Sequence, residues 1–518
     1  GVLFVTDLAN EAVDGTHGKL LVGGNVDCFA DGRTKAPVFT QAGRSDNGSL
    51  SGRVSFAKYD TMLGFIEYVD YVDGTFEGAA GSVVRLLKSG GEVKLRESKS
   101  VAGLLIDPDG TGSWKPLTID AAATLSVGDG VTPACILVGT GRNGSITAVE
   151  GGKVDFGSSE GVIAIGERVN WAYSAIPTFD TCLTGQNGVT FASVANVPVS
   201  FVALKRTSTY EGGTKIGGIG VRIYDGQALG TDAVTVFPGR TAGGQVAFMS
   251  PMTVANDFTI AGSGMPEGAT NSEYPCGALA FKAEGEVRLT GDVHIDDYAR
   301  VSTSRGEDKD YAEGGVFAGV VSGGKLEILN TDANGGAPVV FTRANAYTNG
   351  TDVFCARVVL RGAAPSLGTG DVLMDRAWLC FENMAALEFA NNITGSGTVV
   401  LKGAAPVSFT VDVSGFSAIL DFAGSQQTFT EFPSFATEIT NSSTVPARLI
   451  LAAGLGTVKL DGRIVSGKLD LEIGEGTLLD LCGADVTVRR CYDGAEKRVV
   501  NGTLHETNPQ QGMLMIVR

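Results

Sequence analysis

Gly-Glu-Val-Arg-Leu, at residues 285–289, contains the pattern that decides the fold: glycine, a variable residue, an aliphatic residue, a polar residue and a second apolar residue. Side chains alternate between the two faces of a β-strand, so the apolar positions face one side and the polar positions face water. A strand this short cannot bury its apolar face alone. Similar segments recur along most of the chain, beginning at Gly91, Gly152, Gly244, Gly285, Gly324, Gly397, Gly456 and Gly467.

This recurrence predicts a β-solenoid, in which each turn of chain stacks on the next and the apolar stripes merge into one core. The composition agrees, because 73 of the 518 residues are glycine, which suits frequent turns, whereas only 16 are proline and 43% are hydrophobic. A disordered chain would contain fewer apolar residues. The residues expected to point inward are Val93, Val154, Val287, Leu326, Val399, Val458 and Leu469.

Two longer segments also resemble each other. Residues 209–216, Thr-Tyr-Glu-Gly-Gly-Thr-Lys-Ile, precede a glycine-bounded strand at 226–236; residues 346–353, Ala-Tyr-Thr-Asn-Gly-Thr-Asp-Val, precede a similar segment at 362–374. These stretches, with their Ala-Leu-Gly and Ser-Leu-Gly runs, resemble the autotransporter-associated β-strand repeat of bacterial surface and secreted passenger proteins. Residues 358–383 fit that repeat best. The resemblance implies a right-handed parallel β-helix that a bacterium exports to the cell surface or the extracellular space.

The predicted organisation has three parts: an N-terminal strand and capping region at 1–85, a parallel β-solenoid at 86–480 and a C-terminal antiparallel hairpin cap at 481–518. Caps are expected because the end turns of a solenoid expose unpaired backbone groups. At the C-terminal end, Asp493-Gly494 and Asn501-Gly502 are dipeptides that favour tight hairpins.

The N-terminal region is rich in aromatic residues between positions 56 and 76. After Asp60, a good helix N-cap, apolar residues recur at helical spacing, which predicts a short capping helix. The alternative is a platform on which sugar rings stack. The residues at helical spacing are Met62, Phe65, Ile66 and Val69.

The formal charge of −17 and the isoelectric point near 4.7 oppose a nucleic-acid partner, because binding phosphates requires clustered Lys and Arg. No stretch approaches the roughly 18 consecutive apolar residues of a membrane-spanning helix, so no membrane insertion is expected.

Catalytic signatures are fragmentary. Asn330-Thr-Asp332 and Asp296-Asp297 resemble parts of the polygalacturonase signature, in which carboxylates act as acid and base. Their order is reversed relative to that family, and the His-Gly pair that should follow them occurs only at residues 17–18. Because Asn and Asp also stabilise turns through hydrogen bonds to their own backbone, we expect turns and no catalytic residues.

Metal and cofactor sites are also not expected. The segments 107–112 and 330–335 contain only the first half of an EF-hand calcium loop, and the bidentate Glu is missing. Weak calcium binding by the many acidic residues is the one remaining expectation of this kind. The eight cysteines are too sparse for a disulfide scaffold. Two pairs have a spacing that suits a disulfide: Cys355 with Cys380, about one turn apart, and Cys482 with Cys491, on either side of a predicted strand.

The segment Val2, Leu3, Phe4 and Val5 combines high β propensity with a position ahead of the predicted cap. Such a strand can add to a sheet edge of a neighbouring molecule or fold back as the first strand of its own cap. Together these features predict a structural, non-enzymatic β-solenoid that forms a homo-oligomer or fibre, as part of a surface fibre, sheath or adhesin stalk. The alternative function is a carbohydrate-binding or polysaccharide-degrading β-helix, either a glycoside hydrolase or a polysaccharide lyase.

Overall fold

The computed structural model describes most of the chain. The described residues are 3–6, 38–42, 53–60, 64–107, 114–139, 144–166, 176–193, 200–239, 243–265, 277–303, 314–330, 335–403, 405–410, 413–460, 463–464, 468–492, 494–507 and 514–517.

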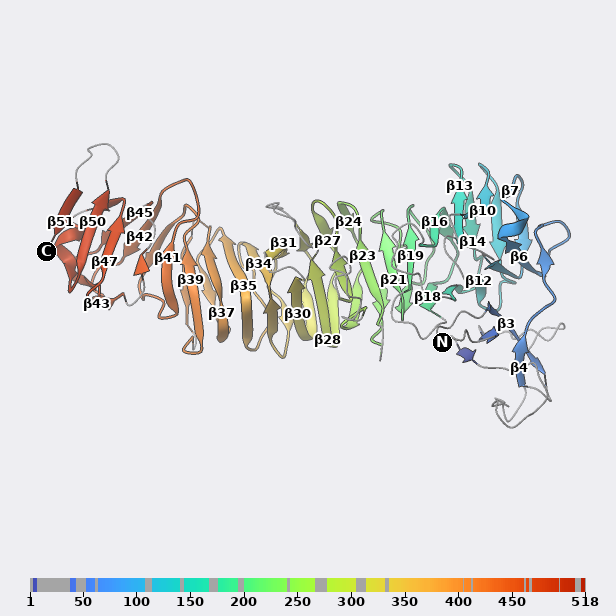
Figure 1. Cartoon of the computed structure of the whole chain (residues 1–518), viewed down its shortest axis with the longest axis horizontal. Helices are drawn as coiled ribbons and strands as arrows, with labels where there is room; N and C mark the ends of the chain where they lie inside the picture. Colours follow the sequence, from blue (N-terminus) through green and yellow to red (C-terminus); the bar gives the residue numbers. More distant parts are fainter. Residues whose placement is uncertain are drawn as a thin grey trace. The chain divides into compact units, whose positions relative to one another are not determined.

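The chain is an all-β parallel β-solenoid of about 15 turns (Figure 1). It divides into two compact units, Gly1–Gly291 and Asp292–Arg518. The described residues contain no α-helix, only the short 3-10 helices η1 (Lys88–Gly90) and η3 (Ala495–Arg498). No helical segment among them has the length and hydropathy needed to cross a membrane.

The first unit stacks parallel strands in register. Its main sheet includes β9 (Gly103–Asp107), β12 (Ala134–Val138), β15 (Gly161–Ile165), β18 (Val189–Ser193), β20 (Thr214–Gly217), β22 (Val234–Val236) and β25 (Phe258–Gly262). One position of each strand faces its equivalent in the next turn, and all seven side chains are buried. This column is Leu104, Ile136, Ile163, Phe191, Ile216, Val236 and Ile260.

The second unit repeats this arrangement with strands β34 (Ala356–Gly362), β35 (Val372–Asn383), β37 (Ile393–Leu401), β39 (Phe416–Asp421) and β41 (Ala436–Thr440). Its buried column is Val358, Leu379, Val399, Leu420 and Ile439. Such columns remove apolar area from water in every turn, at roughly 25 cal/mol per Å². The stacked stripes predicted from the sequence are therefore the core.

Two further sheets close the turns of the second unit. One contains β40 (Gln426–Phe429), β42 (Ala447–Leu451), β45 (Leu469–Ile473) and β48 (Arg490–Tyr492). The other contains β43 (Gly456–Lys459), β46 (Thr477–Asp480) and β49 (Val499–Val500). In this part of the chain each turn passes through three strands, for example β41, β42 and β43.

The predicted inward positions are largely confirmed: Val154, Val287, Leu326, Val399 and Leu469 are buried. Val93 and Val458 are only partly buried. In those two copies the second apolar residue, Leu95 or Leu460, is the buried one.

The repeated Tyr-containing segments form a matching internal contact in both units. Tyr210 and Tyr347 are fully buried, and their hydroxyl groups lie 2.7 and 2.8 Å from Thr214 Oγ1 and Thr351 Oγ1. The Leu-Gly runs that follow supply a glycine beside each ring. A Cβ at Gly230 would lie 2.5 Å from the Tyr210 ring, and one at Gly368 would lie 2.4 Å from the Tyr347 ring. The repeated glycine therefore makes room for the repeated tyrosine.

The predicted N-terminal helix is wrong. Residues Arg53–Asp60 and Gly64–Glu67 form strands β3 and β4, which pair in antiparallel fashion with Asp60 opposite Gly64. The apolar spacing there matches a helix, but Phe, Ile and Val also favour strands, and Gly64 weakens a helix. Met62 lies outside the described residues, whereas Val69 follows β4 and is exposed.

The predicted C-terminal hairpin is also not formed at Asn501-Gly502, and Asp493 of the other dipeptide lies outside the described residues. Strand β47 (Asp485–Val488) pairs in parallel with β50 (Thr503–Thr507), and β48 and β49 join the earlier turns in parallel. The stacked register therefore prevails over the local turn preference. The antiparallel pair lies further on, between β50 and β51 (Leu514–Val517).

Candidate functional site

A concave feature of the second unit lies where one ladder of strands is interrupted. Strands β36 (Leu387–Phe389) and β38 (Val407–Phe409) form a sheet of two strands, and β40, one turn later, belongs to the four-stranded sheet instead. A pocket of about 690 Å³ lies at this interruption. We call it the β38 groove. The described residues that line it are 386–388, 406–410, 413 and 428–434.

Two half-buried phenylalanines, Phe409 and Phe432, line the groove. The Phe409 ring packs edge-to-face on Phe381, at 5.8 Å between centroids, and on Phe435, at 5.0 Å. Phe432 packs on Phe429 at 5.6 Å. Since the three supporting rings are buried, both groove rings are held from behind while part of each remains accessible.

The polar lining of the groove consists of hydroxyl and carboxylate groups. Thr410 Oγ1 donates a hydrogen bond of 2.9 Å to Glu388 Oε1. None of the described lining residues is Lys, Arg or His. The exposed polar residues are Glu388, Ser408, Thr410, Thr428, Thr430, Glu431 and Ser434.

The acidic fragments singled out in the sequence lie elsewhere. Asp296 and Asp297 are exposed at a bulge of β28 (Val293–Thr303), where Asp297 has a left-handed backbone with φ of 69°. Asn330 is buried at the end of β30 (Val321–Asn330), and Asp332 lies outside the described residues. The pair therefore lies at an irregularity within β28, and not in the turn between strands that was expected.

The histidines do not join these carboxylates in a described cluster. His294 Nδ1 lies 3.2 Å from Ser322 Oγ on the exposed side of β28 and β30. His505 is in β50, and His17 lies outside the described residues. Among the described residues, no group of three or more His, Cys, Asp or Glu side chains is arranged to hold a metal ion.

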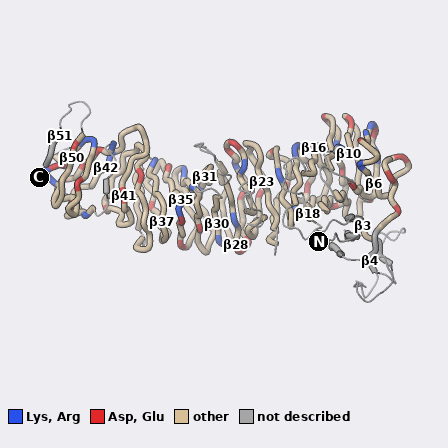
Figure 2. Tube along the Cα trace, in the orientation of Figure 1, with Lys and Arg blue, Asp and Glu red and all other residues tan. Residues whose placement is uncertain are grey.

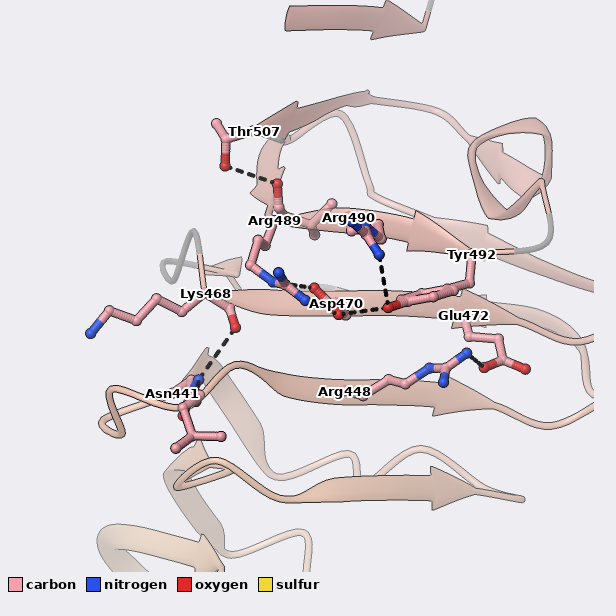
Figure 3. A network of polar contacts seen from close by, with 11 residues as sticks. Asn441, Arg448, Lys468, Asp470, Glu472, Arg489, Arg490, Tyr492 and Thr507 are labelled. Atoms are coloured by element: carbon pink, nitrogen blue, oxygen red, sulfur yellow. Dashed lines mark hydrogen bonds and ion pairs between the residues drawn. The ribbon is translucent and has the colours of Figure 1, made fainter. Parts of the chain in front are cut away.

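A dense polar network joins neighbouring turns near the C-terminal end (Figure 3). Asp470 is 4% exposed, and its carboxylate receives a 2.7 Å hydrogen bond from Arg489 Nε and a 3.3 Å hydrogen bond from the Tyr492 hydroxyl. The Arg448 guanidinium lies 3.9 Å from the centre of the Tyr492 ring and pairs with Glu472. The hydrogen bond to Asp470 raises the pKa of Arg489.

Asp470 is the polar position of the repeat copy that begins at Gly467, so the strand pattern predicts that it faces water and tolerates replacement; the structure shows that it is buried instead. Its partners are 19 and 22 residues later, about one turn of the solenoid. Sequence alternation alone cannot show which outward positions are covered by side chains of the next turn. The spacing of opposite charges by one turn is the signal that was available.

Other ion pairs also connect successive turns, and Figure 2 shows acidic and basic residues distributed along the solenoid rather than gathered in one block. Glu382 accepts from Arg361 at 2.8 Å and from Lys402 at 3.1 Å. Burial alone would raise the pKa of Glu382, but the hydrogen bonds from these two cations outweigh it and lower the pKa. These pairs align the turns on the outside of the core.

None of the four cysteines proposed for disulfides is in a disulfide in the structure. Cys380 stands opposite Val359 in the preceding turn, not opposite Cys355, which follows β33 (Thr351–Phe354) in a left-handed conformation. Cys482 is exposed and Cys491 is partly buried in β48.

The remaining candidates lie near the N-terminus. Leu3, Phe4 and Val5 belong to β1 (Leu3–Thr6), which pairs in parallel with β2 (Val38–Ala42) of the same chain, while Val2 lies outside the described residues. In the aromatic region, Phe56 and Tyr68 are buried in a core cluster with Val83 and Leu105. This favours the core interpretation over a sugar platform for those two rings.

Comparison of the chain with protein-family models, with curated proteins and with solved structures finds no match.

Proposed function

We propose that the protein is an extracellular structural β-solenoid that self-associates as part of a bacterial surface fibre, sheath or adhesin stalk. The observation that carries the proposal is that successive turns stack on one another through equivalent buried residues. Each unit contains an unbroken buried column, and ion pairs such as Arg361–Glu382–Lys402 connect its turns on the outside. A stack of this kind resists extension along many parallel ladders, which suits a mechanical role.

The test is the assembly state of the purified full chain. Sedimentation velocity over a wide concentration range and electron microscopy of the same samples should show particles that grow with concentration. A chain lacking residues 1–5 should form shorter particles if the N-terminal strand adds to a neighbouring sheet edge. A single species at monomer mass at every concentration would contradict self-association.

The carbohydrate alternative is favoured by one specific observation, the β38 groove, with its accessible aromatic rings and exposed hydroxyl and carboxylate side chains. Binding there does not require self-association, and a stalk can also carry such a site.

A further inference from the structure

We propose that the β38 groove binds an oligosaccharide that carries no acidic groups. The proposal is independent of whether the chain forms fibres. It rests on the aromatic rings, the polar lining and the charge of the groove.

The rings supply apolar contact surface. A sugar ring has a face of C–H groups that packs on the electron-rich face of an aromatic ring. Phe409 and Phe432 are half-buried in the lining, and buried rings hold each of them in place. A ligand therefore gains contact area without the cost of ordering these side chains.

The polar lining matches hydroxyl groups. Glu388, Glu431 and five Ser or Thr side chains are exposed in the groove. Carboxylates accept hydrogen bonds only, whereas hydroxyl groups both donate and accept, so together they can satisfy a ligand with many O–H groups. A volume of about 690 Å³ is within the range of sites that hold small organic ligands.

The charge of the groove excludes acidic glycans. Two carboxylates and no described cation line it, and the whole chain has a formal charge of −17. A uronic acid or sulfated sugar would meet like charge without a basic partner, which is unfavourable. Neutral sugars and amino sugars do not meet this repulsion.

An extended peptide is the other occupant that the site suggests, because β38 pairs only with β36 among the described strands. Strand addition depends on backbone N–H and C=O groups along the edge. Pro406, directly before β38, and Pro433, in the lining segment 428–434, lack the N–H donor that a pairing strand uses. The recognition groups exposed in the groove are instead side-chain hydroxyls and carboxylates, which favours the glycan.

The test is calorimetric titration of the full chain with defined hexasaccharides: β-1,4-glucan, β-1,4-mannan and β-1,4-glucosamine as non-acidic probes, and oligogalacturonate as the acidic probe. At least one non-acidic probe should bind, and oligogalacturonate should bind at least tenfold more weakly. Phe432→Leu should weaken binding roughly 5- to 10-fold because it removes the ring, whereas Phe432→Tyr should retain binding.

The matched control is Phe237→Leu, since Phe237 is an aromatic residue that is 44% exposed and lies outside the groove. This variant should bind as the original chain does, and thermal unfolding should confirm that the groove variants are folded. The proposal is overturned if none of the three non-acidic probes binds, if oligogalacturonate binds equally well, or if Phe237→Leu lowers affinity as much as Phe432→Leu. The proposal is also overturned, in favour of a peptide, if an alternating Lys-Val peptide binds more tightly than the non-acidic hexasaccharides. That peptide binding should then be lost in the double variant Glu388→Gln with Glu431→Gln.

Discussion

Leu401 and Leu469 show how strongly one side chain is tied to the stack. Both are fully buried; Leu401 is the last residue of β37, and Leu469 is the first residue of β45. Replacing either with Asp would place a carboxylate without a partner in the apolar core. We expect the free energy of unfolding to fall by about 4 kcal/mol or more, measured by denaturant titration.

The control for these variants is Lys402→Asp, at an exposed neighbour whose side chain pairs with Glu382 at 3.1 Å. Losing that pair should cost less than about 1 kcal/mol. Equal losses at positions 401 and 402 would show that the register of β37 is incorrect.

Asp470 is the buried acceptor in an ion pair with Arg489. Asp470→Lys would leave the Arg489 guanidinium without its acceptor and place a second cation beside it. We expect a loss of about 2–4 kcal/mol in the free energy of unfolding, reduced from the value for fully buried pairs because Arg489 is 24% exposed. Glu475→Lys, at an exposed turn position nearby, should change stability by less than about 0.5 kcal/mol. A result in which both variants are equally mild would place Asp470 in solvent.

Tyr347 should make the free energy of unfolding fall as pH rises in the alkaline range. Burial raises the pKa of its phenol to about 12, and the hydrogen bond with Thr351 offsets this only in part. The neutral phenol is thus favoured in the folded chain, and its contribution is complete below the unfolded pKa of about 10. The contribution is lost as pH rises from about 10 through 12, and it is on the order of 2–3 kcal/mol.

The measurement is denaturant unfolding at several pH values between 9 and 12, in roughly half-unit steps, for the original chain and for Tyr347→Phe. The variant should lose less stability than the original chain over this interval. Parallel curves for the two proteins would show that Tyr347 does not titrate with unfolding.

At the scale of elements, the close contact of a glycine turn with a buried ring can be tested directly. A Cβ at Gly368 would lie 2.1 Å from the Tyr347 carbonyl oxygen and 2.4 Å from its ring, so Gly368→Ala must displace the turn or the tyrosine. We expect a loss of about 2 kcal/mol or more, measured as a fall in the melting temperature. Gly90→Ala, where no atom lies within 4 Å of the added Cβ, should be nearly neutral. If the two variants melted together, the turn would not pack on the ring.

The N-terminal aromatic region shows why element type was harder to predict than the strand repeats. The spacing of apolar residues after Asp60 fits a helix, but pairing of β3 with β4 satisfies the backbone and gives strands instead. The repeat strands have alternation, glycine boundaries and many copies in agreement. The aromatic region has a single copy, so its tertiary partners decide its conformation.

At the scale of the whole molecule, thiol reactivity should report on the integrity of the stack. Burial raises the pKa of Cys380 to about 12, and its side chain lies in a cluster with Val316, Val340 and Val359. Cys482 is exposed. With iodoacetamide near pH 8, Cys482 should be alkylated in the folded chain and Cys380 only after unfolding.

Peptide mass spectrometry of non-reduced protein measures both outcomes. The predicted disulfide between Cys482 and Cys491 would instead protect both residues until a reductant is added. Rapid alkylation of Cys380 in the folded chain would contradict the buried column around β35.

The period of two, repeated with glycine boundaries, was enough to predict the stacked strands of the repeats, because alternation places the apolar side chains of each copy on one face. It was not enough for β3 and β4, where a helix was expected. The sequence by itself also identified the tyrosine and glycine segments that the structure brings into contact. Tertiary structure alone decided what depends on neighbouring turns: the burial of Asp470 beneath Arg489 and Tyr492, the placement of Cys380 opposite Val359, and the interruption between β38 and β40 that opens the groove. Those features depend on the number of residues in each turn, because that number sets which residues of neighbouring turns face each other. Strand periodicity does not specify it.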